Sequence, residues 1–269
     1  MKRILFLLLI SSQAFAADIN LDNISKSDLE NVSNELGANF SHTAVSAPET
    51  NGLWGIEVGV VGGKTRSEEL EKVIDRNGGD GDDFKNLPHG GLMARAHFPL
   101  DLFLEATMIP TVKASDAELK SSTLGFGWNA GGFFGLPLDL AVGINASSSE
   151  FSYDQVINNS TTSGLDVNSN ITFKNKTQSL WVGVSKEFLG MLTPYAKFGT
   201  FKSESDIDVD AAGGGTIFAF SSSQKENVET SGGYFAAGLN FQLALFKIGA
   251  EMARANKVSS LTGKLSLDF

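Results

Sequence analysis

The strongest constraint in this sequence is an alternation of apolar and polar residues that recurs from Gly52 to the last residue, Phe269. Successive side chains of a β-strand point to opposite faces, so a period of two predicts strands with one apolar face. Trp54, Ile56 and Val58 begin the first such face. There are about ten such segments in all, each near the 9–11 residues of a tilted membrane strand. They lie around 54–60, 91–98, 102–108, 117–129, 138–145, 180–184, 195–199, 234–241, 246–252 and 261–269.

The composition excludes several classes of protein. The chain has 269 residues, 42% of them hydrophobic, and no cysteine. Beyond the first dozen residues, no stretch approaches the roughly 18 consecutive apolar residues of a membrane helix. Aromatic and β-branched residues are too frequent for a disordered chain. Without cysteine, the chain cannot form a disulfide scaffold, a zinc–thiolate site or a cysteine nucleophile.

Residues 1–16 have the pattern of a cleaved export signal. Lys2 and Arg3 precede the short apolar run Ile4–Ile10, and Ala14–Ala16 fits the small-residue cleavage rule. We expect a mature chain that starts at Ala17, in the periplasm, outer membrane or exterior of a Gram-negative bacterium. Loss of the two cations moves the formal charge from −10 to −12. Such an acidic chain is a poor partner for nucleic acid, whose phosphates repel it.

Residues 17–51 form an N-terminal segment ahead of the alternating region. Ser27 and Glu30 have capping-box spacing, and a helix is predicted over about 27–36. Gly37 is expected to end that helix in a left-handed conformation. The irregular stretch that follows contains Pro48, which bars regular strand pairing. Two placements remain open: a plug folded into the barrel, or a periplasmic lead-in packed against its rim.

Period two alone does not separate a membrane barrel from a soluble sandwich, because both have one apolar face. The connections favour the barrel, since short ones alternate with long polar ones, as periplasmic turns alternate with outer loops. Two of the expected outer connections, near 113–116 and 256–258, are short exceptions. The short turns lie near 99–101, 129–137, 186–193 and 242–245, and the long loops near 64–88, 146–170 and 203–230.

Aromatic residues gather at the predicted periplasmic ends of the strands, where amphipathic rings meet the membrane–water boundary. The opposite face of the strands is rich in Gly, Ser, Asn and isolated charges. That composition suits a polar lumen better than a solvent face, where Lys and Glu dominate. The expected aromatic girdle consists of Trp54, Phe98, Trp128, Phe241 and Phe246, and the same ends also hold Phe103, Phe133, Phe134, Phe188 and Phe269.

The final stretch, Leu261–Phe269, alternates strictly and ends on an aromatic residue. It resembles the terminal strand of bacterial outer-membrane β-barrel proteins, which the assembly machinery recognises. The glycine at Gly263 is one position from the commonest spacing in that family. The resemblance implies an assembly signal made of Leu261, Leu265, Leu267 and Phe269. The stretch Ala38–Gly63 also resembles a family of uncharacterised proteobacterial outer-membrane proteins, and it implies a location but no catalytic or binding residue.

Together these observations predict an all-β fold: a closed antiparallel transmembrane β-barrel of about ten strands over residues 52–269, with a short N-terminal helix. Closure is required because hydrocarbon offers no partner to backbone N–H and C=O groups. An even number of strands leaves both termini in the periplasm. The expected partners are outer-membrane lipid, lipopolysaccharide and the outer-membrane assembly machinery.

The interior of such a barrel is expected to be narrow. About eight strands leave room mainly for side chains, whereas about 16–18 leave a water channel. An open porin is therefore excluded. The charged residues predicted to face this lumen are Glu57, Arg95, Glu105, Lys197, Lys247, Glu251 and Lys264.

Buried charges must be paired, because desolvating a lone ion costs several kcal/mol. Counted from the periplasmic end, Glu57, Arg95 and Glu105 lie at equal depth and are predicted to form a cluster. Glu251 and Lys264 are likewise expected to pair. The network is either a structural core that keeps the barrel closed or a gate that rearranges for a solute.

No enzyme, cofactor or metal site is predicted. His89 lies near acidic residues of the first long loop, and ten-stranded surface proteases use a His–Asp pair. Their chemistry needs further paired acids that the other strands do not supply. The run Asn77–Asp83 and the acids Asp206, Asp208 and Asp210 could hold a divalent cation, but they lack the spacing and distal Glu of an EF-hand and are expected to be solvated.

Two outer segments and two functions remain open. A short helix is expected over 67–75, and residues 212–223 either fold over the mouth as a lid or extend the strands. The first function is a structural anchor that presents surface loops. The alternative is a narrow channel or transporter for small or hydrophobic molecules, gated by the N-terminal segment. The solute is not identified by the sequence.

Overall fold

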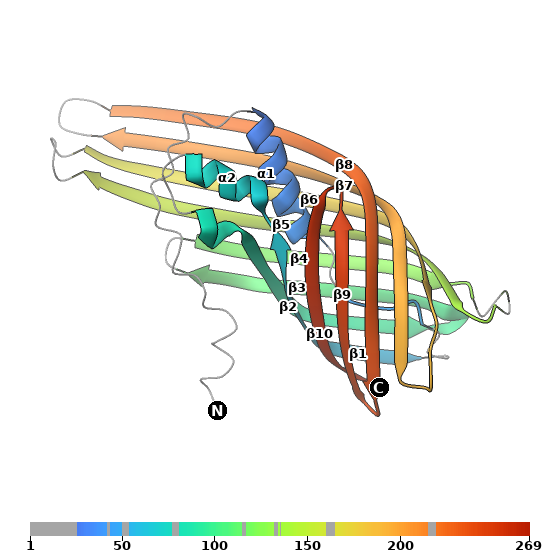
Figure 1. Cartoon of the computed structure of the whole chain (residues 1–269). Helices are drawn as coiled ribbons and strands as arrows, with labels where there is room; N and C mark the ends of the chain where they lie inside the picture. The colour runs from blue at the N-terminus through green and yellow to red at the C-terminus, as the bar shows by residue number, and fades with distance from the viewer. Residues whose placement is uncertain are drawn as a thin grey trace, which may run out of the picture.

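The computed structural model describes residues 26–41, 44–49, 54–76, 81–114, 117–131, 134, 136–159, 165–214 and 219–269. Within these ranges ten antiparallel strands form a closed barrel, which confirms the predicted fold class (Figure 1). The strands are β1 Gly55–Arg66, β2 Asn86–Phe98, β3 Leu102–Ala114, β4 Ala117–Asn129, β5 Asp139–Asn159, β6 Leu165–Ser185, β7 Leu192–Gly214, β8 Ala219–Leu243, β9 Phe246–Ala255 and β10 Val258–Asp268. The helices are α1 Lys26–Asn39, α2 Glu68–Arg76 and the short 3₁₀ turns η2 Gly81–Phe84 and η3 Pro99–Asp101.

The barrel closes where the first strand meets the last. β1 pairs with β10 from Glu57 opposite Asp268 to Thr65 opposite Ser260. One step further, Ile56 and Phe269 exchange backbone hydrogen bonds of 2.9 and 3.0 Å. Each strand therefore has a hydrogen-bonded neighbour on both edges, as an environment without water requires.

The two faces of the wall differ sharply in chemistry. Inward side chains are mostly buried polar or charged groups, whereas outward side chains form an exposed apolar belt around the barrel. A soluble globular protein has the opposite arrangement, with apolar side chains inside and polar ones outside. The period of two predicts the arrangement seen here when the apolar face of each strand points away from the interior. The belt includes Ile56, Val58, Val60, Leu92, Leu104, Met108, Leu124, Phe126, Val142, Ile144, Leu180, Val182, Phe198, Leu239, Ile248, Met252, Leu261 and Leu265.

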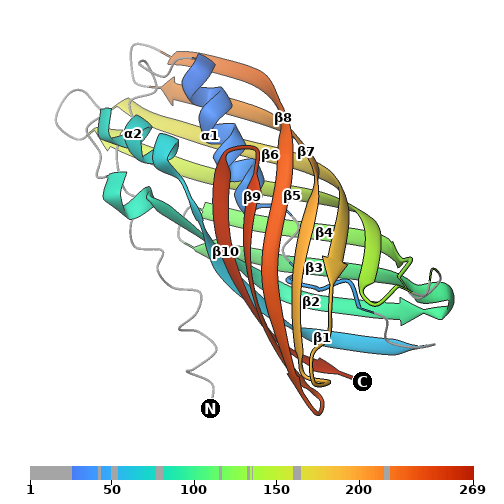
Figure 2. The same cartoon turned by 45° about the vertical axis from the view of Figure 1, so that its right-hand side comes forward.

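Four strands continue far beyond this belt. β5 to β8 have 21, 21, 23 and 25 residues, and they project as a sheet past the other strands (Figures 1 and 2). The prediction of long loops at 146–170 and 203–230 is therefore wrong for most of their residues, which keep regular strand pairing. Beyond the edge of the belt the outward residues are polar. The alternation of apolar and polar residues therefore stops there, and the sequence no longer indicates a strand. The loop tips at 160–164 and 215–218, including Ile217 and Phe218 of the suspected lid, lie outside the described residues.

Helix α1 lies at the end of the barrel from which β5 to β8 project (Figure 2). Its first turn contacts α2 through Asp28, whose carboxylate is 2.5 Å from Arg76 Nη2. Further along, Asn34 accepts a hydrogen bond from Asn256 in the β9–β10 turn. At its last residue, Asn39 contacts His89 of β2. The chain thus runs from this end of the barrel toward the opposite end, where β1 begins and β10 stops.

Gly37 does not end α1 as predicted. The helix continues to Asn39, and Gly37 lies where the helix approaches the wall most closely. A Cβ at this position would overlap the hydroxyl of Ser203 on β7. The glycine is therefore explained by close packing rather than by a left-handed turn. In the described ranges, neither helix is long and apolar enough to cross a membrane.

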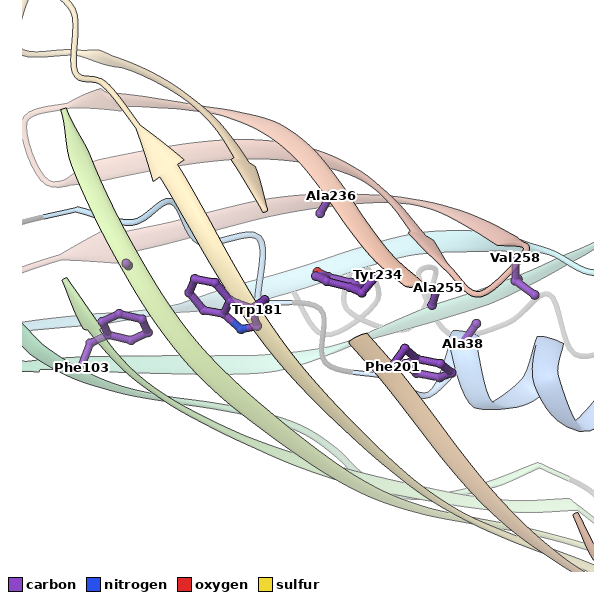
Figure 3. Packing of buried hydrophobic residues seen from close by; sticks show 9 residues of the cluster. Ala38, Phe103, Trp181, Phe201, Tyr234, Ala236, Ala255 and Val258 are labelled. Atoms are coloured by element: carbon purple, nitrogen blue, oxygen red, sulfur yellow. The ribbon is translucent and has the colours of Figure 1, made fainter. Parts of the chain in front are cut away.

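A row of buried apolar side chains lines the interior and joins the barrel to α1 (Figure 3). Phe103 and Trp181 stack with ring centroids 6.2 Å apart. Farther along the same row, Phe201 lies beside Ala38 of α1 (Figure 3). Phe103 was expected at the aromatic girdle, but it is 1% exposed and faces inward, as its place in the alternation of β3 requires.

The large interior rings each lie over a glycine of the neighbouring strand. Phe103 is directly opposite Gly127, Trp181 opposite Gly143 and Tyr195 opposite Gly238. A Cβ on Gly127, Gly143 or Gly238 would overlap the facing ring. Glycine inside a strand weakens the strand but permits such close approach.

We predict that Gly238→Ala destabilises the protein by about 1–3 kcal/mol, because the new methyl group displaces the Tyr195 ring in a filled interior. Gly233→Ala on the same strand is the matched control, since nothing lies within 4 Å of its Cβ position. Chemical denaturation in detergent followed by circular dichroism measures both changes. Equal midpoints for the two variants would show that the ring does not depend on the glycine.

Candidate functional site: the barrel interior

Residues 44–49 of the N-terminal segment lie inside the barrel rather than against its rim. Residues 44–48 are buried, and Ala47 accepts a hydrogen bond of 2.9 Å from Nη1 of Arg95 on β2. Ser185 of β6 donates to the carbonyl of Pro48. Val45 packs with Val61 and Met93. Strands on both sides of the lumen therefore hold this segment in place, mainly through its backbone carbonyls and small apolar side chains.

Lys247 of β9 is the centre of the charge network. Its ammonium lies 2.7 Å from Oε2 of Glu49 in the N-terminal segment and 3.0 Å from Oδ2 of Asp268. Oε2 of Glu57 is 3.8 Å away. The lysine side chain is 1% exposed. A buried cation of this kind is tolerated only because several carboxylates surround it.

The carboxylate of Glu57 on β1 lies near a lysine of β9 and a lysine of β10. Its Oε1 lies 2.8 Å from the ammonium of Lys264 and accepts a hydrogen bond of 2.6 Å from Ser266. Both charged side chains are at most 1% exposed. The pair therefore spans the β1–β10 seam that closes the barrel.

The predicted pairing of Glu251 with Lys264 is wrong. The register sets Glu251 opposite Thr262 and Lys264 opposite Gly249, so the two charges are offset by two residues. Glu251 instead lies 3.2 Å from the ammonium of Lys197 and accepts a hydrogen bond of 2.9 Å from the Tyr195 hydroxyl. Tyr195 reaches straight across β8 because the intervening residue, Gly238, has no side chain, and Lys197, which is opposite Ala236, reaches Glu251 diagonally.

Arg95 lies between its two predicted acidic neighbours and also has contacts outside the predicted cluster. The register does set Arg95 between Glu57 and Glu105, and all three are buried. The guanidinium, however, donates to the carbonyl of Ala47 and lies 4.3 Å from the centroid of the Phe103 ring. The cation of Arg95 therefore holds the N-terminal segment and an aromatic ring, while Glu57 takes its cations from β9 and β10.

The histidine that suggested a protease is part of a neutral hydrogen-bond network. His89 contacts Thr262 at 2.8 Å, Asn39 at 3.1 Å and Thr65 at 3.2 Å. Asp75 accepts a hydrogen bond from the backbone N–H of Gly81. Among the described residues, no group of three His, Asp or Glu side chains is arranged to hold a metal ion. His42 and Asp80 lie outside the described residues.

At the other end of the lumen, α1 is joined to α2 by an acidic cap. The carboxylate of Glu35 accepts hydrogen bonds from the backbone N–H groups of Glu69 at 2.8 Å and Leu70 at 2.9 Å. These are the free N–H groups at the start of α2, where a negative charge is favourable. Burial nevertheless raises the pKa of Glu35, and the nearby carboxylates of Glu69 and Glu68 act in the same direction.

One interior cavity has a volume of about 20 Å³ and lies between Asn39, His89, Thr107 and Thr123. A single water needs about 10–15 Å³ measured in this way. The cavity is therefore a site for about one water and not a passage.

The predicted girdle residues lie at the end of the barrel where β1 begins. The terminal residues instead spread along the wall, from Leu261 opposite Lys64 to Leu267 opposite Val58. Trp54 is 70% exposed and packs edge-on against the Phe98 ring, with centroids 5.8 Å apart. Phe241 and Phe246 are exposed, whereas Phe98 and Trp128 are half-buried. On β10, Leu261, Leu265 and Phe269 are exposed and Leu267 is half-buried.

Comparison with protein families and with curated proteins finds no match. Among solved structures, the chain is similar to Ail, the attachment invasion locus protein of Yersinia pestis, at 14% identity over 82% of this chain and 100% of that chain, with a TM-score of 0.32. The translocator domain of the autotransporter NalP from Neisseria meningitidis follows at 12% identity, 82% and 89% coverage and a TM-score of 0.41. The toluene transporter TbuX of Ralstonia pickettii has 6% identity, 86% and 93% coverage and a TM-score of 0.34. Likeness at these levels carries no conclusion about activity.

Sequence reasoning missed several interior residues. Glu49 was not recognised as a partner of Lys247, because the position of its segment was open. Trp181 was not assigned to the interior, although it is buried there. The signal that could have found it is the alternation itself, since its ring occupies an inward position of β6.

We predict that Lys264→Met destabilises the protein by about 3–5 kcal/mol, because it leaves Glu57 buried with one close cation fewer. Glu57→Gln in the same chain should restore most of the loss, since the uncompensated charge is then removed. Lys120→Met is the control: its pair with Glu150 is half-exposed, and the loss should stay below about 1 kcal/mol. Denaturation midpoints in detergent give the comparison. A Lys264→Met variant as stable as the control would contradict the assigned pair.

Proposed function

We propose that this protein is an integral outer-membrane barrel of a Gram-negative bacterium. The support is the exposed apolar belt around a closed barrel with a polar interior. Contiguous apolar surface of this extent is rare on soluble monomers. The expected export signal at residues 1–16 agrees with this location. In this assignment the rings at the short-turn end, such as Trp54 and Phe246, lie at the membrane boundary, and β10 serves as the assembly signal.

We propose further that the barrel is a closed anchor that presents a surface structure. The observation that carries this function is the filled lumen, in which residues 44–49 and the ion pairs of Lys247 and Lys264 occupy the interior. The presented structure is the β5–β8 sheet with α1 packed at its base and α2 packed against α1. The sheet's outward face is polar and carries ion pairs such as Lys225–Asp208 at 3.1 Å. The proposal assigns no catalytic group, cofactor or metal.

In this orientation the short turns and Phe269 face the periplasm, and α1, α2 and the long strands face outward. The start of α1 then lies at the cell surface, because the chain passes inward through the lumen before it enters β1. The sequence predicted that both termini are periplasmic. In this orientation the start of β1 and the end of β10 face the periplasm, but the start of α1 does not. The difference arises because residues 44–49 lie in the lumen, between α1 at one end of the barrel and the start of β1 at the other.

This topology predicts the labelling of single cysteines on intact cells, because the chain has no native cysteine. Ser27→Cys, at the exposed start of α1, should react with a membrane-impermeant maleimide. Glu187→Cys, in the exposed β6–β7 turn, should react only after the outer membrane is permeabilised. The opposite result for the two positions would reverse the orientation and, with it, the proposed display of the sheet.

One observation favours a second candidate, a channel closed by the N-terminal segment. Residues 44–49 form no strand in the barrel, and their contacts with the wall are individual hydrogen bonds and ion pairs. Such contacts can be broken without breaking the wall. The Glu49–Lys247 pair is the strongest of them, so it is the natural point of release.

We predict that the purified protein shows no stepwise conductance in a planar bilayer. Glu49→Gln, which keeps the fold but removes the charge facing Lys247, and a deletion of residues 18–50 should also be silent if the protein is an anchor. Steady conductance of the wild type would overturn the anchor. Conductance that appears only in the two variants would establish the closed channel instead.

A further inference from the structure

The outer wall of the barrel is hollowed at one place. A shallow groove of about 430 Å³ lies on the outward side of β5 to β8. Its exposed lining combines two apolar side chains with four polar ones: Ile144, Leu180, Gln178, Thr200, Lys202 and Ser231. This groove is unrelated to the lumen network, and the anchor function does not use it.

The strand register arranges this lining in two rows. Ile144, Leu180 and Thr200 are direct neighbours across β5, β6 and β7. One outward position further along the strands, Gln178 neighbours Lys202, which in turn neighbours Ser231 of β8. The first row belongs to the edge of the apolar belt and the second row begins the polar sheet. The groove therefore crosses the boundary between the two surfaces.

The hollow has a simple cause in the sequence. Thr200 is opposite Gly233 on β8, and nothing lies within 4 Å of where a Cβ of Gly233 would stand. Gly232, beside it, also lines the groove. The absence of side chains at this end of the row leaves room beside Leu180 and Thr200.

The polar row carries one lysine, Lys202, where it meets the belt, and the next outward residue of β7, Glu204, is opposite Lys176 and Glu229. Lys202 is 54% exposed, and its pair with Glu229, at 3.2 Å, is a surface pair that contributes little. Lys176 lies exposed one further outward position along β6. The same placement recurs around the barrel, because an exposed cation stands one or two outward positions beyond the last apolar residue of five strands. These cations are Lys64, Lys120, Lys176, Lys202 and Arg254.

We propose that the groove binds an anionic phospholipid, with the phosphate beside Lys202 and Lys176 and an acyl chain along Leu180 and Ile144. The inference rests on the proposed membrane location. Cations at a membrane surface attract anionic lipid headgroups, and ammonium groups form charge-assisted hydrogen bonds with phosphate oxygens. The apolar row supplies contact that a free anion could not use. The recurring cations on the other strands form a broader ring of positive side chains around the barrel. The groove is a hollow in the surface beside two of them, Lys176 and Lys202.

Lipid titration of the folded full-length chain in detergent, followed by native mass spectrometry, tests this site. Phosphatidylglycerol and phosphatidylcholine with identical acyl chains are the two probes. We expect one phosphatidylglycerol to be retained in preference to phosphatidylcholine. Lys176→Gln and Lys202→Gln should each weaken that binding about fivefold, the effect of removing one cation near a charged headgroup.

Lys225→Gln is the matched control, because it also removes a surface lysine paired with an acid at 3.1 Å but lies far beyond the belt on β8. It should leave phosphatidylglycerol binding unchanged. Leu180→Ser should weaken the binding of the lipid, and soluble glycerol phosphate at millimolar concentration should not displace it. Equal retention of both lipids, an equal loss in the control, or displacement by glycerol phosphate would each overturn the lipid site. A chain that stays folded and monomeric without detergent would instead overturn the membrane location itself.

Discussion

The pairing of β1 with β10 is the interaction on which the rest of the structure depends. It removes the two edges that an open sheet would present, and so satisfies every wall strand on both sides. The same seam carries the strongest part of the interior network, since Glu57 on β1 meets Lys264 and Ser266 on β10. Backbone closure and charge compensation therefore coincide, and neither is complete without the other.

Much of the fold could be predicted because the alternation is a local signal. The bounds of β4, the number of strands and the short turns follow from period two and turn residues alone. The prediction was wrong where the outward face changes chemistry. Beyond Ile144 and Leu180 the outward face is polar, so β5 to β8 lose the apolar period of that face and look like loops, although their strand pairing continues for many residues.

The sequence predicted which charged residues face the interior, but it did not predict which of them form ion pairs with one another. Alternation alone assigns Glu57, Arg95, Lys197, Lys247, Glu251 and Lys264 to the lumen, and all are buried. Which charges meet depends on the register between strands, on diagonal reach across an intervening strand, and on the N-terminal segment that enters from outside the alternating region. The contact of Glu251 with Lys197 across β8, and that of Lys247 with Glu49, illustrate the last two causes. None of these quantities has a local signature.

The long sequence separation between the interior charges has a consequence for folding kinetics. Glu49 and Glu57 are made early in the chain, and the lysines that neutralise them belong to β9 and β10, about two hundred residues later. Contacts of such long sequence separation form slowly, because a large loop must close first. A partly assembled barrel consequently holds carboxylates that only water can solvate, so its lumen stays hydrated until the final hairpin docks. Expulsion of that water belongs to the last step of assembly, when the enclosed segment is also locked in place.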